Sequence, residues 1–94
     1  MVVLILEKVP VSLRGELSRW MLEPKSGVFV GKVSAMVRDK LWEKTVKSVK
    51  SGSAILDYQT NNPQGYILRS HGEASRQVVD VEGLQLIKIP LKSN

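Results

Sequence analysis

Hydrophobic and polar positions in the first half of the chain follow the two periods typical of strands and helices. Residues 2–6 are all valine, leucine or isoleucine, a run that predicts a central strand buried on both faces. A second short apolar run at residues 28–30 lies between Gly27 and Gly31 and predicts another strand.

An amphipathic helix is predicted after each of these strands. The first spans residues 12–22 with Ser12 as its N-cap, and the second spans residues 34–50 with Ser34 as its N-cap. Both helices need the same sheet face for their apolar residues. We expect the apolar residues of both helices to pack in the core, including both tryptophans. These residues include Leu13, Leu17, Trp20, Met21, Leu41 and Trp42.

The second half of the chain reads as a hairpin followed by a loop and extra terminal strands. The pattern predicts a strand at 53–60, a turn at 61–65, a returning strand at 66–69, an exposed loop at 71–77, and short apolar segments at 78–81 and 84–91. Together the elements predict an α+β sandwich of ferredoxin-like type, with two helices on one face of a mostly antiparallel sheet. A length of 94 residues predicts one domain, residues 1–94.

Composition narrows the class of protein. With 43% hydrophobic and 24% charged residues, the chain is in the ordinary globular range. It contains no cysteine, which excludes disulfides and thiolate metal sites. No apolar run approaches the roughly 20 residues that a membrane span requires, so we expect no membrane association and a cytoplasmic location.

Charge points to a polyanionic partner. The formal net charge is +5, from 14 lysines and arginines against 9 acids. Arg38 falls on the apolar half of the second helix, where a charge is costly unless it is paired or has an external ligand. A phosphate is one such ligand, and a buried pair with Glu23 or Asp57 is the alternative. The lysines of the same helix, Lys40, Lys44, Lys47 and Lys50, read as a solvated face, with DNA contact as the alternative.

Several blocks of sequence, distributed along nearly the whole chain, have the order and spacing of a known protein family. They are VVLILE at 2–7, LRGEL at 13–17, WMLE at 20–23, GVFVG at 27–31 with Arg38 and Trp42 after it, and VDVEGL at 79–84. In these blocks the chain resembles the CRISPR-associated Cas "two" family, type I-E subtype. The resemblance implies a ferredoxin-like homodimer that bridges two dimers of the CRISPR integrase subunit and holds a double-stranded prespacer DNA.

The resemblance also implies residue roles. Arg14, Arg38 and Arg76 are expected to contact the DNA backbone, which confers no sequence preference. A merely solvated Arg14 is the alternative reading. Weaker candidates for DNA contact are Arg69 and Lys25. Ser12 and Met36 stand where relatives can carry basic residues, which predicts a thinner or shifted basic clamp.

Glu7 ends the first predicted strand, at a place where relatives usually carry an aspartate. There the acid is proposed to hold a divalent metal ion together with its symmetry mate, and two carboxylates would suit Mg²⁺, which could activate water against a phosphodiester. A magnesium-dependent endonuclease, with Glu7 as catalytic and metal-binding residue, is therefore the alternative to a non-catalytic scaffold. The sequence offers no nearby acid or base to complete a hydrolytic site, which favours a structural role for Glu7.

The C-terminal segment, residues 78–94, is predicted to dock partners. The resemblance implies that it contacts the integrase subunit, and an extended segment can do so by adding to a sheet edge. Strand exchange with the second protomer is the alternative. The residues expected to make this contact are Leu84, Leu86, Ile87 and Ile89. A single-strand RNA binder is disfavoured, because the few aromatic residues form no base-stacking motif.

Overall fold

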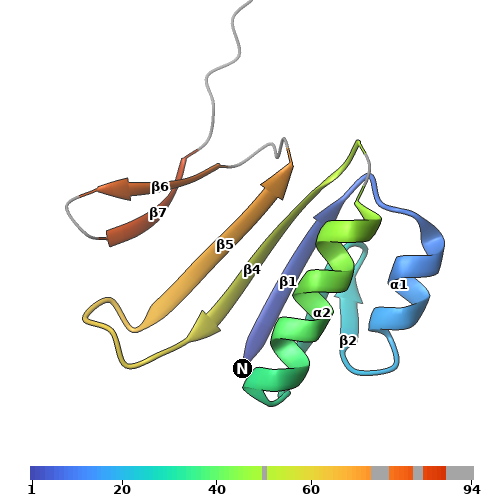
Figure 1. Ribbon diagram of the computed structural model, residues 1–94, viewed down its shortest axis with the longest axis horizontal. Coiled ribbons are helices and arrows are strands. Elements are labelled where there is room, and N and C mark those ends of the chain that lie inside the picture. Colours follow the sequence, from blue (N-terminus) through green and yellow to red (C-terminus); the bar gives the residue numbers. More distant parts are fainter. Residues whose placement is uncertain (50, 73–76, 82–83, 89–94) are drawn as a thin grey trace, which may run out of the picture.

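The computed structural model describes residues 1–49, 51–72, 77–81 and 84–88. In this part of the chain, two helices lie on one face of an antiparallel sheet (Figure 1). The helices are α1 (Val11–Leu17) and α2 (Ala35–Ser48). The strands are β1 (Val2–Glu7), β2 (Leu22–Lys25), β3 (Val28–Gly31), β4 (Ser53–Gln59), β5 (Tyr66–Gly72), β6 (Gln77–Val81) and β7 (Leu84–Lys88).

The sheet has the strand order of a ferredoxin-like fold. Its five described strands run β2-β3-β1-β4-β5, and β1 pairs with β3 on one side and β4 on the other. The elements from β1 to β4 follow the order β-α-β-β-α-β, so the predicted α+β ferredoxin-like class is confirmed. Strands β6 and β7 form a separate hairpin beside β5 (Figure 1).

The core lies between the helices and the sheet. On β1 the side chains of Val2, Leu4 and Leu6 are buried, while Ile5 keeps 38% of its surface exposed. Successive strand residues point to opposite faces, so the helices cover only one face of β1. The central position of this strand is confirmed, but in the single chain only one of its faces is fully buried, contrary to the prediction. The apolar run continues onto the open face.

The first helix is shorter than predicted. It ends at Leu17, where the Ser18 hydroxyl donates to the Arg14 carbonyl at 2.9 Å, instead of continuing to residue 22. Its N-cap is Pro10, which makes no side-chain capping bond, so the assignment of Ser12 as cap is wrong. Trp20 therefore lies beyond the helix and is 55% exposed, contrary to the expected core position.

Strand β2 was not anticipated. The sequence pattern places its residues in the end of the first helix and a turn, but Leu22 pairs with Val30 and Lys25 with Val28 across the β2–β3 ladder. Pro24 is compatible with this strand because β2 is at the edge of the sheet, where one side of the backbone needs no ladder partner.

The second helix and the hairpin largely match the predictions. Ser34 caps α2 by accepting a bond from the Val37 amide at 3.2 Å, as expected, and Trp42 packs half-buried against the core. Strand β5 extends to residue 72, so His71 belongs to a strand and not to the predicted loop. Neither described helix is long or apolar enough to cross a bilayer.

Candidate nucleic-acid interface

Arg38 is held against an aromatic ring of the sheet. Its guanidinium carbon lies 3.8 Å from the centre of the Tyr58 ring, and its Nε donates to the Asp39 carboxylate at 3.0 Å. Only 17% of the Arg38 side chain is exposed. Stacking of this kind stabilises a partly desolvated guanidinium by about 0.5–2 kcal/mol. The alternative pairing with Glu23 or Asp57 is wrong, because Tyr58 and Asp39 hold the charge instead.

Arg69 reaches the same ring from β5. Its guanidinium carbon is 5.5 Å from the Tyr58 ring centre, and its Nη1 lies 3.7 Å from the same Asp39 oxygen that accepts from Arg38. Arg69 pairs with Leu56 in the β4–β5 register and is therefore a diagonal neighbour of Tyr58 on the helix-covered face. We refer to Arg38, Asp39, Tyr58 and Arg69 as the two-arginine cluster.

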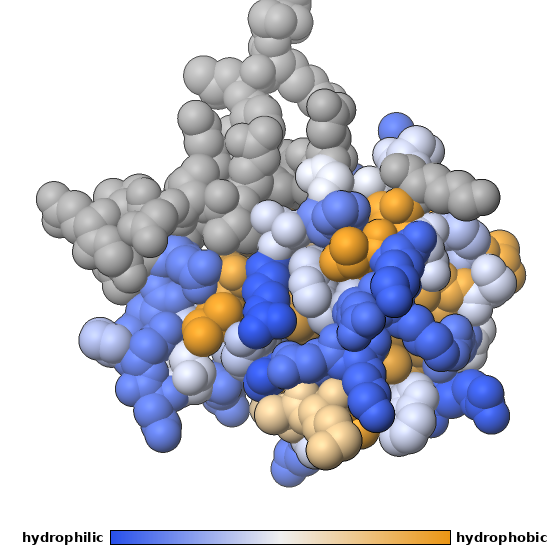
Figure 2. All heavy atoms as spheres, in the orientation of Figure 1, coloured by the Kyte–Doolittle hydropathy of each residue, from blue (hydrophilic) through white to orange (hydrophobic). Residues whose placement is uncertain are grey.

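The two-arginine cluster joins residues that are distant in sequence. The helical wheel marks Arg38, but the sequence makes Arg69 only a weak candidate and does not indicate that Tyr58 and Asp39 belong to this site. The hairpin register that places Arg69 diagonally from Tyr58 is the signal that links these residues. In Figure 2 hydrophilic side chains gather over α2 and the neighbouring part of the sheet.

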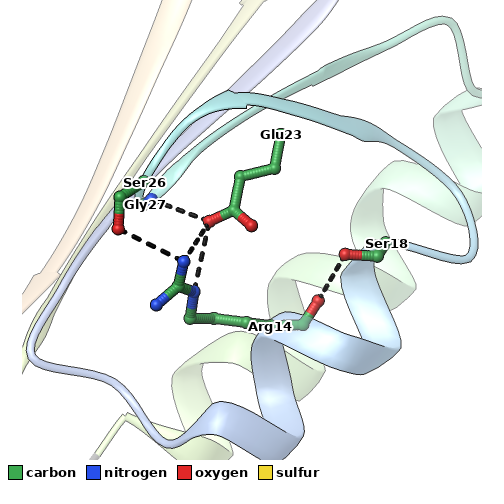
Figure 3. A network of polar contacts seen from close by, with 5 residues as sticks. All are labelled: Arg14, Ser18, Glu23, Ser26 and Gly27. Carbon is green, nitrogen blue, oxygen red and sulfur yellow. Dashed lines mark hydrogen bonds and ion pairs between the residues drawn. The ribbon is translucent and has the colours of Figure 1, made fainter.

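Arg14 is engaged in a network with the β2–β3 turn (Figure 3). Its Nε and Nη2 donate to Glu23 Oε2 at 3.1 and 2.7 Å, and Nη2 also donates to the Ser26 hydroxyl at 3.2 Å. The same carboxylate oxygen accepts from the Gly27 amide at 2.8 Å. Arg14 is thus neither isolated nor merely solvated: it connects α1 to the β2–β3 turn, and Glu23 offsets its charge.

The same network keeps Glu23 ionised. The hydrogen bond from the Gly27 amide lowers the pKa of the Glu23 carboxyl, burial partly opposes this, and the bond and charge of Arg14 lower it further. Gly27 has a φ of 81°, in the left-handed region that favours glycine, and a Cβ there would meet the Leu6 carbonyl oxygen at 2.5 Å. Glycine at this position allows the turn to present its amide to Glu23.

The lysines of α2 are exposed, and two of them are paired. Lys44 contacts Glu16 of α1, and Lys47 bonds Glu43 at 3.1 Å. A shallow groove of about 460 Å³ between the helices is lined by the side chains of Trp20, Val37, Lys40, Leu41, Lys44 and Lys47, together with Glu16 and Glu43. These contacts fit the reading of a solvated face, and Lys50 lies outside the described residues.

Glu7 is half-buried at the end of β1, opposite Ser53 of β4. The backbone here is tightly packed: a Cβ on Gly52 would lie 2.2 Å from the Glu7 carbonyl oxygen, and Lys8 has a φ of 55°. Within the described part of a single chain, no group of three or more histidine, aspartate or glutamate residues could hold a metal ion. The predicted magnesium site pairs Glu7 with the same residue of a second chain, so it stays a prediction.

The expected partner-docking residues are only partly described. Leu84, Leu86 and Ile87 belong to β7, and Ile87 is exposed. Arg76 and Ile89 lie outside the described residues. What the sequence did not reveal is the role of Gln85, whose side-chain amide accepts from the Leu68 N–H and donates to the Leu68 carbonyl, both at 2.8 Å. This clamp attaches the β6–β7 hairpin to the edge of β5.

The open sheet face carries apolar side chains together with the acids Glu7 and Asp57. Ile5 is partly exposed, and Leu22, which pairs with Val30 on this face, is 75% exposed. Asp57 also points to this face, because it pairs with Val3 across the β1–β4 ladder. Burial raises the pKa of the Asp57 carboxyl, and the nearby amino terminus of the chain partly opposes this shift.

Comparison with protein families gives one result of wide coverage. The family model described as CRISPR-associated protein (Cas_Cas2CT1978) matches residues 1–86. The match extends from β1 into β7 and therefore includes the two-arginine cluster, the Arg14 network and Glu7.

Proposed function

Because this chain belongs to that CRISPR-associated, Cas2-type family, we propose that it is a dimeric DNA-binding scaffold of the spacer-acquisition complex. In this role a homodimer bridges two dimers of the CRISPR integrase subunit and holds the prespacer duplex. Its DNA ligand would place it in the cytoplasm. Assignment to type I-E systems is part of the proposal and rests on the sequence resemblance.

The observation that carries the proposal is the two-arginine cluster. Two guanidinium groups contact one carboxylate, which leaves an excess of positive charge on a surface that is still partly open to solvent. Guanidinium groups bind phosphate oxygens with paired N–H donors, and such contacts recognise the DNA backbone without reading bases. A scaffold for spacers of varying sequence needs this kind of recognition.

The open sheet face supports the homodimer. Apolar side chains without a helix over them, including Ile5 and Leu22, are costly to leave in water. A second copy that presents the same face would cover them with matching chemistry and would form an isologous, two-fold interface.

The exposed side of the β6–β7 hairpin is the proposed contact with the integrase subunit. Ile87 offers an apolar side chain there, and the Gln85 clamp keeps the hairpin beside β5. Exchange of terminal strands between protomers is the alternative use of this segment.

A reconstituted integration reaction with the integrase subunit and a prespacer duplex tests the proposal. We expect Glu7→Gln to retain integration, because a scaffold needs no metal-bound water. We expect Arg38→Gln to bind the duplex about tenfold more weakly, since a charge-assisted contact contributes about 1.5 kcal/mol or more. Lys47→Gln, a change of equal charge in a lysine already paired with Glu43, is the matched control and should have a small effect.

Two results would contradict the scaffold. One is a Glu7→Gln variant that loses integration while its duplex affinity is unchanged, which would favour the magnesium-dependent nuclease. The other is wild-type duplex affinity that stays flat between low and moderate salt, because phosphate contacts release counterions and must weaken as salt rises.

A further inference from the structure

The two-arginine cluster contains an acid that competes for the same donors as a phosphate would. One oxygen of Asp39 is 3.0 Å from Arg38 Nε and 3.7 Å from Arg69 Nη1. Each guanidinium has five N–H donors, far more than one carboxylate can accept. The cluster therefore has both an excess of donors and an anion that already occupies part of them.

We propose that the two-arginine cluster is a binding site for one backbone phosphate of duplex DNA, and that Asp39 is an internal anion which the phosphate displaces. This inference rests on the proposed DNA-binding function and adds to it Arg69 as a second phosphate ligand. It also assigns Asp39 a role that lowers DNA affinity.

Asp39 is suited to displacement because it is weakly held. Its side chain is 51% exposed, and its ion pairs with Arg38 and Arg69 use a single oxygen, Oδ1. Glu23 in the Arg14 network differs: it is less exposed and is anchored by the Gly27 amide in addition to Arg14. A carboxylate without such an anchor can rotate toward the solvent when an anion that binds the arginines more strongly is present.

The arginines, in contrast, have a support that does not depend on Asp39. Tyr58 is buried, and its ring lies under the Arg38 guanidinium and near that of Arg69. Stacking orients the plane of a guanidinium and leaves its edge donors available. Tyr58 is therefore a positioning residue that keeps both groups aimed at the same point after Asp39 has left.

The central experiment compares Asp39→Asn with Glu43→Gln in duplex binding at fixed salt. Both variants remove one negative charge from an exposed position of α2, but Glu43 pairs with Lys47 and not with the two arginines. We expect Asp39→Asn to bind a duplex about two- to fivefold more tightly than wild type. This factor corresponds to the free energy of one solvent-exposed ion pair, which the phosphate no longer has to break. Glu43→Gln should show a smaller gain.

A combination of substitutions shows whether the gain passes through the arginines. In an Arg38→Gln, Arg69→Gln background, Asp39→Asn should no longer tighten binding, whereas the small effect of Glu43→Gln should persist. A gain from Asp39→Asn that survives in this background would overturn the proposal, because the effect would then be a general one of charge. Circular dichroism and thermal unfolding of each variant confirm that the fold is retained.

Inorganic phosphate provides a readout independent of DNA. The Nε–H signals of Arg38 and Arg69 in NMR spectra should shift on phosphate titration at lower concentrations in Asp39→Asn than in wild type. If Asp39→Asn binds both duplex and phosphate no better than Glu43→Gln, the inference about Asp39 is wrong. The scaffold proposal would still hold in that case, provided that the wild-type protein binds the duplex in a salt-dependent way. If phosphate binds as expected but no duplex does, the scaffold proposal and the assignment of this site to DNA both fail, and only an anion site formed by the two arginines remains.

Discussion

At the level of single residues, the Glu23 carboxylate shows how an ion pair can serve structure before it serves binding. It accepts bonds from the Gly27 amide and from Arg14, and these contacts lower its pKa in the folded protein. A carboxyl whose pKa is lowered on folding stabilises the fold above its unfolded pKa of about 4.3, and this contribution is lost as the pH falls through the folded value.

We therefore expect Glu23→Gln to lower the thermal midpoint at pH 7, where wild-type Glu23 is ionised. The difference between the two proteins should shrink as the pH falls below about 4.3 and should vanish once wild-type Glu23 is protonated. Thermal unfolding of both proteins from pH 7 to pH 2.5 measures this. A midpoint difference that is the same at every pH would show that shape, and not charge, explains the effect of the substitution.

At the level of elements, attachment of the β6–β7 hairpin to β5 centres on one residue, Gln85. The Gln85 amide makes two bonds to the Leu68 backbone, the same pairing that a neighbouring strand would provide at the edge of β5. The Gln85 N–H also donates to the Gln64 side chain at 2.6 Å, and the Tyr66 hydroxyl donates to the Gln85 carbonyl at 2.7 Å.

Gln85→Leu keeps a side chain of similar size but removes both bonds to Leu68. We expect it to lower the free energy of unfolding by about 1–3 kcal/mol, at roughly 0.5–1.5 kcal/mol for each bond. The Leu68 amide should also exchange with solvent faster. Denaturant unfolding and hydrogen exchange test this, with the exposed strand residue Gln59→Leu as control. Unchanged Leu68 exchange in Gln85→Leu would mean that the clamp does not hold the hairpin.

At the level of the whole molecule, the proposed dimer and the proposed DNA surface use opposite faces of the sheet. The two-arginine cluster is on the helix-covered face, and the apolar residues of the open face are on the other side. This separation allows the dimer interface to be disrupted without touching the residues proposed to bind phosphate.

Ile5→Arg tests the dimer. Ile5 is partly exposed on the central strand of the open face, so a single chain should tolerate the arginine, whereas two chains packed through this face would bring two charges into an apolar contact. We expect a dimer dissociation constant at least about tenfold higher, a change of 1.4 kcal/mol. Analytical ultracentrifugation measures it. Val11→Arg on the exposed start of α1 is the control, and equal dissociation of both variants would exclude this face as the interface.

The sequence by itself determined the features that depend on local pattern. The apolar run of β1, the Ser34 cap of α2 and the hairpin of β4 and β5 were all predicted, because strand alternation, capping and turn chemistry act between residues close in sequence. The position of Arg38 on the apolar half of its helix also marked it as a residue in need of a partner.

Only the tertiary structure decided the features that depend on distant neighbours. Strand β2 exists because β3 offers it a ladder, and with the helix ended at Leu17, Trp20 lies outside the core that helical spacing predicted for it. The ring that holds Arg38 and the second arginine beside it come from strands about 20 to 31 residues further along the chain. A helical wheel shows that a charge needs a partner, but the partner is set by the register of strands that the wheel does not include.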